Sequence, residues 1–146
     1  MKHFVLAAAM LASLAVPALA IDGSSAEGGR KLTATLSGAT EVPGPGDTDG
    51  QGSAEFRVNP GQGSVCYTVT HSGIDAPTAA HIHSGAAGIS GGVVVPLKVG
   101  AGGAIEGCAG ITREQAMALI QSPEGFYANL HNAAFPGGAI RGQLSK

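Results

Sequence analysis

Three histidines are the residues of this chain best suited to chemistry. His81 and His83 stand two positions apart, and His131 lies in a second stretch, 128–132. A β-strand sends residues i and i+2 to the same face, with Cα atoms about 6.6 Å apart. Two imidazoles at that spacing can bind one ion at bond lengths of about 2.0 Å. The spacing indicates a metal site that His131 would complete from another strand.

Strand parity tests whether the third histidine can join the pair. The apolar residues that we expect in the core are Ile82, Leu130, Ile140 and Leu144. The opposite parity of the same strands holds polar side chains: His81, His83, Asn129, His131, Arg141 and Gln143. Neighbouring strands lie about 4.8 Å apart, so His131 can reach an ion held by the other two. We predict a three-histidine group, with Asn129 and Arg141 supporting it on the same polar face.

The ligand set suits Cu²⁺ or Zn²⁺, because both ions bind neutral imidazole. A fourth position would be filled by water, by Asp75 or by His71, which is the candidate fourth histidine ligand. The sequence does not choose between the two metals. The alternative is that the histidines only hydrogen-bond to turns and neighbouring strands.

Short strands must position these side chains. Alternating apolar and polar residues, many of them β-branched, are typical of half-buried strands. The stretches with this pattern are 31–37, 52–59, 64–71, 78–83, 92–99, 104–110, 126–132 and 138–145. Tight turns predict two hairpins, one joining 52–59 to 64–71 and one joining 126–132 to 138–145. Pro96 indicates an edge strand or a bulge within 92–99.

One short helix interrupts the strands. Thr112 and Gln115 form the Thr-x-x-Gln pattern of a capping box, and good helix formers follow at 116–120. The helix should end before Pro123. The predicted fold class is all-β, a Greek-key antiparallel β-sandwich or barrel of about seven or eight strands with one short helix.

The start of the chain predicts export. Residues 1–20 have a basic start, an apolar run of about 13 residues and an Ala-x-Ala cleavage site, which are the marks of a signal peptide. We expect 21–30 to be a flexible lead-in and 31–146 to form one domain. The sequence has no stretch long enough to span a membrane after cleavage. The predicted location is secreted or periplasmic.

The two cysteines and the charge agree with that location. Cys66 and Cys108 most simply form one disulfide in an oxidising compartment, and two buried free thiols are the alternative. Loss of Lys2 with the signal peptide leaves seven basic residues against ten acidic ones, a formal charge of −3. With no basic cluster and no Trp, the chain lacks the features of a nucleic-acid-binding protein.

Motifs of common enzyme classes are missing or lack their context. The stretch 88–92 matches Gly-x-Ser-x-Gly, but a strand and not a helix follows it, so we interpret it as a glycine turn. The chain has no Walker loop and no paired carboxylates of the glycosidase kind.

Two blocks of the sequence resemble the CHRD domain, first named from chordin. The first is Ala-His-Ile-His-Ser-Gly at 80–85 with Gly-Gly-Val-Val-Val-Pro-Leu at 91–97. The second is Tyr-Ala-Asn-Leu-His at 127–131 with Pro-Gly-Gly-Ala-Ile-Arg-Gly-Gln-Leu at 136–144. The likeness runs from about Lys31 to Leu144 and includes the three histidines. Ala139 stands where the family often has an acidic residue.

The resemblance implies an extracellular β-domain of the single-domain type that bacteria export. In chordin such domains belong to an antagonist of growth factors, and we do not carry that role over. The His-x-His strand is also similar to part of the copper-zinc superoxide dismutase site, although the histidine-rich bridging loop is absent.

Three functional hypotheses follow, of which the first is favoured. The chain is an exported binding module with a Cu²⁺ or Zn²⁺ site, or it is a structural or cell-surface protein-interaction domain without a metal. A dismutase-like metalloenzyme ranks third, so the interpretation leans away from an enzyme. The expected partners are a metal ion or an extracytoplasmic protein, and the oligomeric state is left open.

Overall fold

The computed structural model describes residues 28–146. The predicted signal peptide, 1–20, and most of the predicted lead-in, 21–30, lie outside the described residues. The first strand begins at Arg30, at the end of the predicted lead-in.

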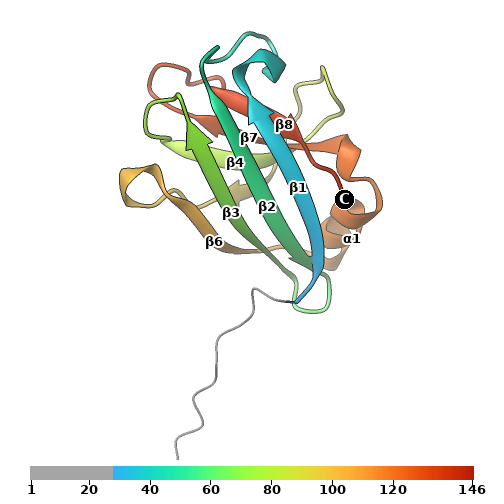
Figure 1. Cartoon of the computed structure of the whole chain (residues 1–146). Coiled ribbons are helices and arrows are strands. Elements are labelled where there is room, and N and C mark those ends of the chain that lie inside the picture. Colours follow the sequence, from blue (N-terminus) through green and yellow to red (C-terminus); the bar gives the residue numbers. More distant parts are fainter. Residues whose placement is uncertain (1–27) are drawn as a thin grey trace, which may run out of the picture.

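Eight antiparallel strands form one sheet that curls into a nearly closed barrel (Figure 1). The strands are β1 (Arg30–Ser37), β2 (Gln51–Asn59), β3 (Ser64–Ser72), β4 (Ala79–Ser84), β5 (Val93–Leu97), β6 (Ile105–Gly110), β7 (Phe126–His131) and β8 (Ile140–Gln143). Their order is β5-β4-β7-β8-β1-β2-β3-β6. The two edge strands, β5 and β6, contact each other and bring the ends of the sheet together. This confirms the predicted all-β class, the two hairpins and the strand count.

One α-helix, α1 (Arg113–Gln121), lies near the end of the barrel where β1 begins (Figure 1). Its N-terminus carries the predicted capping box: the Gln115 N–H donates to Thr112 Oγ1, and the Thr112 N–H donates to Gln115 Oε1. Ala116 and Leu119 are buried on its inner side. Single 3₁₀ turns, η1 (Gly38–Thr40), η2 (Ala101–Gly103) and η3 (Pro123–Gly125), complete the described helical segments.

The core fills the barrel with the apolar residues of alternating positions. Fully buried members include Leu32, Phe56, Ile82, Leu130 and Ile140. Their burial removes apolar side chains from water, which is the main force holding the sheet closed. The opposite parity of each strand therefore faces outward, as the alternation predicts.

Pro96 lies in an edge strand, as predicted. It is paired with His81 across the β4–β5 ladder, whose register shifts between Ile82 and His83. An edge strand tolerates proline because no further strand needs its missing N–H.

The predicted disulfide joins the neighbouring strands β3 and β6. Cys66 and Cys108 are directly paired in the ladder and linked by their sulfurs. The bond closes a loop of 42 residues, for which chain entropy predicts a stabilisation of about 4 kcal/mol. It also ties the edge strand β6 to its neighbour β3.

Within residues 28–146, no helix has both the length and the apolar character needed to cross a membrane.

Candidate metal centre

The three predicted histidines meet on the outer face of the adjacent strands β4 and β7. His81 is paired with Asn129, and His131 is paired with Ala79, two residues before His81. Ligand nitrogens of the three histidines all lie within 4.8 Å of one another. The parity argument placed them correctly, because Ile82 and Leu130 point into the core between them.

Backbone carbonyls fix the tautomers of two of these imidazoles. His83 Nδ1 lies 3.0 Å from Gly91 O, and His131 Nδ1 lies 3.0 Å from Pro136 O. A carbonyl oxygen only accepts, so each Nδ1 carries the proton and donates it. Both Nε2 atoms therefore carry a lone pair that can accept a hydrogen bond or bind an ion, which is the usual arrangement of a metal-binding histidine with an outer hydrogen-bond partner.

The remaining nitrogen positions fit one ion. His81 Nδ1 lies 3.2 Å from His131 Nε2. Two ligands of a tetrahedral ion with bonds of about 2.0 Å are about 3.3 Å apart. His83 Nε2 is buried and has no hydrogen-bond partner among the described residues. A buried polar atom without a partner costs about 1–3 kcal/mol, which a bound ion would offset.

Burial favours the neutral form of two of the imidazoles. It lowers the pKa of His81, and neighbouring His131 and His83 lower it further by charge repulsion. Burial also lowers the pKa of His131; its hydrogen bond to Pro136 opposes this shift, while repulsion from His83 adds to it. Neutral imidazole is the form that binds metal ions, so the environment favours ligation at neutral pH.

Tyr127 holds the His83 ring in place, and sequence reasoning missed it. The two rings stack with centroids 4.9 Å apart and planes 4° apart. Tyr127 Oη accepts a hydrogen bond of 3.2 Å from the Gly91 N–H, beside the carbonyl that binds His83. Its signal in the sequence is the strand parity that it shares with Asn129 and His131, whereas its place opposite His83 follows from the β4–β7 register.

Asn129 and Arg141 lie where the polar face was predicted, but both are buried. His81, Asn129 and Arg141 form a row across β4, β7 and β8. Asn129 is 3% exposed and Arg141 is 1% exposed. Loop 85–92 contributes to the burial of Arg141, because Arg141 Nη2 donates a 2.7 Å hydrogen bond to Ile89 O. The guanidinium carbon also lies 3.5 Å from the centroid of the Tyr127 ring.

Glu41 is a buried acidic residue that sequence reasoning did not single out. It is 6% exposed, and Asn129 Nδ2 donates to its Oε1 over 3.5 Å. Burial raises the pKa of Glu41, while the Asn129 hydrogen bond, the charge of Arg141 and the backbone at Val42 oppose that shift. Its sequence signal is only its place in the block 36–43, just before two prolines.

His71 and Asp75 do not join the histidine group. His71 lies near the end of β3, where its Nε2 is 3.3 Å from Gly103 O. Asp75 uses its backbone oxygen to accept from Asn132 Nδ2. Within residues 28–146, the cluster of possible ligands therefore consists of His81, His83 and His131.

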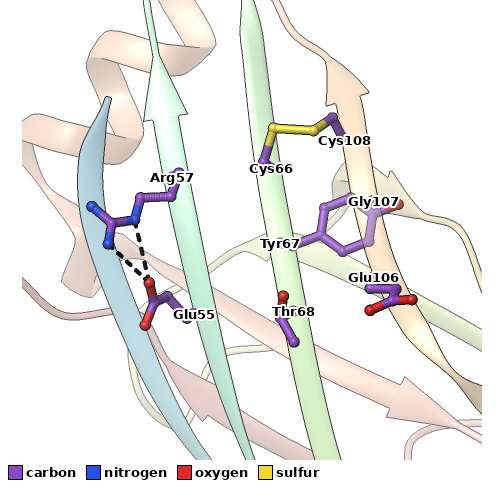
Figure 2. Close-up of a pocket in the computed structure, with 8 residues that line it drawn as sticks. All are labelled: Glu55, Arg57, Cys66, Tyr67, Thr68, Glu106, Gly107 and Cys108. Carbon is purple, nitrogen blue, oxygen red and sulfur yellow. Dashed lines mark hydrogen bonds and ion pairs between the residues drawn. A yellow bond between two sulfur atoms is a disulfide. The ribbon is translucent and has the colours of Figure 1, made fainter. Parts of the chain in front are cut away.

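A separate hollow of about 880 Å³ lies over β2, β3 and β6 (Figure 2). The Cys66–Cys108 disulfide borders one end of it, and Glu106 borders the other. Its charged groups are already engaged in part, because Arg57 pairs with Glu55 at 3.2 Å. The histidine group lies elsewhere on the barrel, on β4 and β7.

Comparison with known families identifies the chain. The family model of the CHRD domain matches residues 32–144, which is most of the sequence. No curated protein and no solved structure matches it. The matched region contains all eight strands except the first two residues of β1. The chain therefore belongs to the CHRD domain family.

Proposed function

We propose that the protein is an exported CHRD-domain binding module that holds one Cu²⁺ or Zn²⁺ ion through His81, His83 and His131. The observation that carries this proposal is the buried Nε2 of His83, which lacks a partner among the described residues. It belongs to a group whose ligand nitrogens lie within 4.8 Å of one another.

Each histidine has a defined part in this proposal. His83 and His131 present Nε2, because their Nδ1 atoms are held by Gly91 O and Pro136 O. His81 supplies the third nitrogen, and Tyr127 fixes the orientation of His83 by stacking. An ion bound by three imidazoles keeps one position for water or for a donor from a partner. A binding role uses that open position without requiring catalysis.

Export is part of the same proposal. The features of residues 1–20 support a signal peptide, with 21–30 as lead-in and 31–146 as the exported domain. The Cys66–Cys108 disulfide is compatible with an oxidising compartment, secreted or periplasmic. Such a compartment would give the site access to extracytoplasmic metal ions.

The competing function is a protein-interaction domain without a metal. The observation that favours it is the 3.2 Å contact between His81 and His131, which serves as a hydrogen bond when no ion is present. In that case the histidines would only tie β4 to β7. The unpaired His83 Nε2 weighs against this alternative, since a hydrogen-bonding role leaves that atom without a function.

Calorimetric titration of the exported protein with Cu²⁺ and Zn²⁺ separates the two functions. We expect one ion per chain with a dissociation constant below about 100 μM. His81→Ala and His131→Ala should each abolish this binding. His71→Ala is the matched control, because it removes a histidine outside the group and should leave the affinity unchanged. Weaker binding, or binding insensitive to His81→Ala and His131→Ala, would reject the metal site.

A further inference from the structure

The loop between β7 and β8, residues 132–139, carries the carbonyl that orients one of the histidines. His131 Nδ1 donates to Pro136 O over 3.0 Å, which leaves the lone pair of His131 Nε2 available to the proposed ion. The position of this carbonyl therefore bears directly on the metal site.

The tip of this loop has little packing to hold it. Ala133, Ala134, Pro136 and Gly137 are exposed, so they bury little apolar surface. Proline has no N–H, so Pro136 cannot anchor its own peptide by donating a hydrogen bond. The place of its carbonyl depends on how the neighbouring residue, Phe135, is held.

Asn132 is the buried residue that holds Phe135. It directly follows His131 in the chain and is 1% exposed. Its Oδ1 accepts a 2.8 Å hydrogen bond from the Phe135 N–H, and its own N–H donates to Phe135 O over 3.4 Å. A side-chain oxygen that accepts from an N–H three residues on is a common way to fix a turn. The turn closed by Asn132 brings Pro136 O back to His131.

The other end of the same amide binds the loop that leads into β4. Asn132 Nδ2 donates to Asp75 O over 3.4 Å. Further along that loop, the Thr78 N–H donates to His131 O over 2.8 Å. Because β4 carries the other two histidines, Asn132 connects the segments that present all three. An aliphatic side chain could make neither bond, and an ionised aspartate could not donate.

The bond to Pro136 O matters because a neutral imidazole can carry its proton on either nitrogen. If Pro136 O moves away, His131 Nδ1 loses its acceptor and the proton can occupy Nε2 instead. A protonated Nε2 has no lone pair for a metal ion. Loss of the outer hydrogen-bond partner of a ligand histidine typically lowers metal affinity by about 10–100-fold.

We propose that Asn132 is a positioning residue of the metal site, which holds Pro136 O so that His131 keeps its proton on Nδ1 and presents Nε2 to the ion. Asn132 itself contacts no ion and acts through Phe135 and Pro136. This role rests on the proposed metal function, because it concerns the affinity of the same three-histidine group.

Two measurements on one preparation test this role, at a pH where the imidazoles are neutral. Long-range ¹H–¹⁵N NMR of the metal-free protein reads the tautomer of His131, and calorimetric titration with Zn²⁺ reads the affinity. In the natural protein we expect the proton on Nδ1. Asn132→Ala should shift His131 toward the Nε2 tautomer and weaken Zn²⁺ binding by about 10–100-fold. Asn132→Ser keeps a side-chain oxygen for the Phe135 N–H and should recover most of the affinity.

Asn59→Ala is the matched control. Asn59 Oδ1 accepts a 3.0 Å hydrogen bond from the Gln62 N–H, also three residues on, in the turn between β2 and β3. The substitution removes the same kind of contact from a turn that holds none of the three histidines. It should change neither the tautomer of His131 nor the Zn²⁺ affinity.

The outcomes separate the positioning role from the metal site itself. If the natural protein binds Zn²⁺ and Asn132→Ala binds it equally well, the positioning role is overturned and the metal site stands. If the natural protein binds no Zn²⁺, both are rejected. A proton on Nε2 of His131 in the metal-free natural protein would also overturn the role.

Hydrogen exchange of the natural protein decides the matter if Asn132→Ala does not fold. The Phe135 amide should exchange much more slowly than the Ala134 amide, which has no hydrogen-bond partner within residues 28–146. Equal exchange rates would show that Asn132 does not hold the turn, and would overturn the proposal.

Discussion

Replacement of His83 by Phe should remove the metal site without weakening the metal-free protein. Phenylalanine keeps a flat ring against Tyr127, whose stacked contact with His83 has a centroid distance of 4.9 Å. It also removes the buried Nε2 that lacks a partner, which should gain about 1–3 kcal/mol. Against this, the hydrogen bond to Gly91 O is lost, at about 0.5–1.5 kcal/mol.

The balance predicts that metal-free His83→Phe is as stable as the natural protein, or more stable by up to about 2 kcal/mol. His83→Ala is the matched comparison, because it removes the same nitrogen but leaves a cavity beside Tyr127, at about 2–4 kcal/mol. Urea unfolding in a chelator measures all three free energies of unfolding. A second set with Zn²⁺ at about 100 times its dissociation constant should stabilise only the natural protein, by about 2.7 kcal/mol.

One result would refute this reasoning. If metal-free His83→Phe is less stable than the natural protein by more than about 1 kcal/mol, the imidazole is a structural hydrogen-bonding group and its unpaired nitrogen is not a significant cost. Equal stabilisation of His83→Phe and the natural protein by Zn²⁺ would likewise show that the ion binds elsewhere.

Three other predictions concern the disulfide, the pH dependence and the helix cap. Replacing both Cys66 and Cys108 by Ala should lower the free energy of unfolding by about 2–4 kcal/mol, and thiol labelling of the unreduced, unfolded protein should modify neither cysteine. The lowered pKa values of His81 and His131 mean that the unfolded chain binds more protons just below pH 6.5. Stability of the metal-free protein should therefore be level above that pH and fall as the pH drops through 6.5 toward the lowered values, and a flat urea midpoint there would contradict the shifts. Thr112→Ala removes the side-chain cap of α1 and should cost about 1 kcal/mol in thermal unfolding, whereas an unchanged melting temperature would show that the cap contributes nothing.

The strands and their faces could be predicted from the sequence because alternation is a local pattern. Ile82 and Leu130 mark the core side, and this parity alone set the three histidines on the opposite side. The capping-box pattern that begins at Thr112 likewise predicted the helix α1. Predicted and observed strand ends agree within about two residues, since Gly and Pro turns limit each run.

The surroundings of the site could not be predicted, because they depend on loops that fold back over the sheet. Asn129 and Arg141 were expected on a polar face, and their burial arises from contacts with residues distant in the sequence, Glu41 and Ile89. The contribution of Tyr127 depends on the β4–β7 pairing, which joins segments more than 40 residues apart. The position of His71 near Gly103 could not be predicted either, because the path of the neighbouring loop is not a local property of the sequence.

Anomalous X-ray diffraction from crystals grown with Zn²⁺ tests the central claim most directly. We predict a single strong peak among the three histidines, with bonds of about 2.0–2.1 Å to a nitrogen each of His81, His83 and His131. Absence of a peak at this position, or a peak bound only by other residues such as Asp47 and Asp49, would contradict the claim.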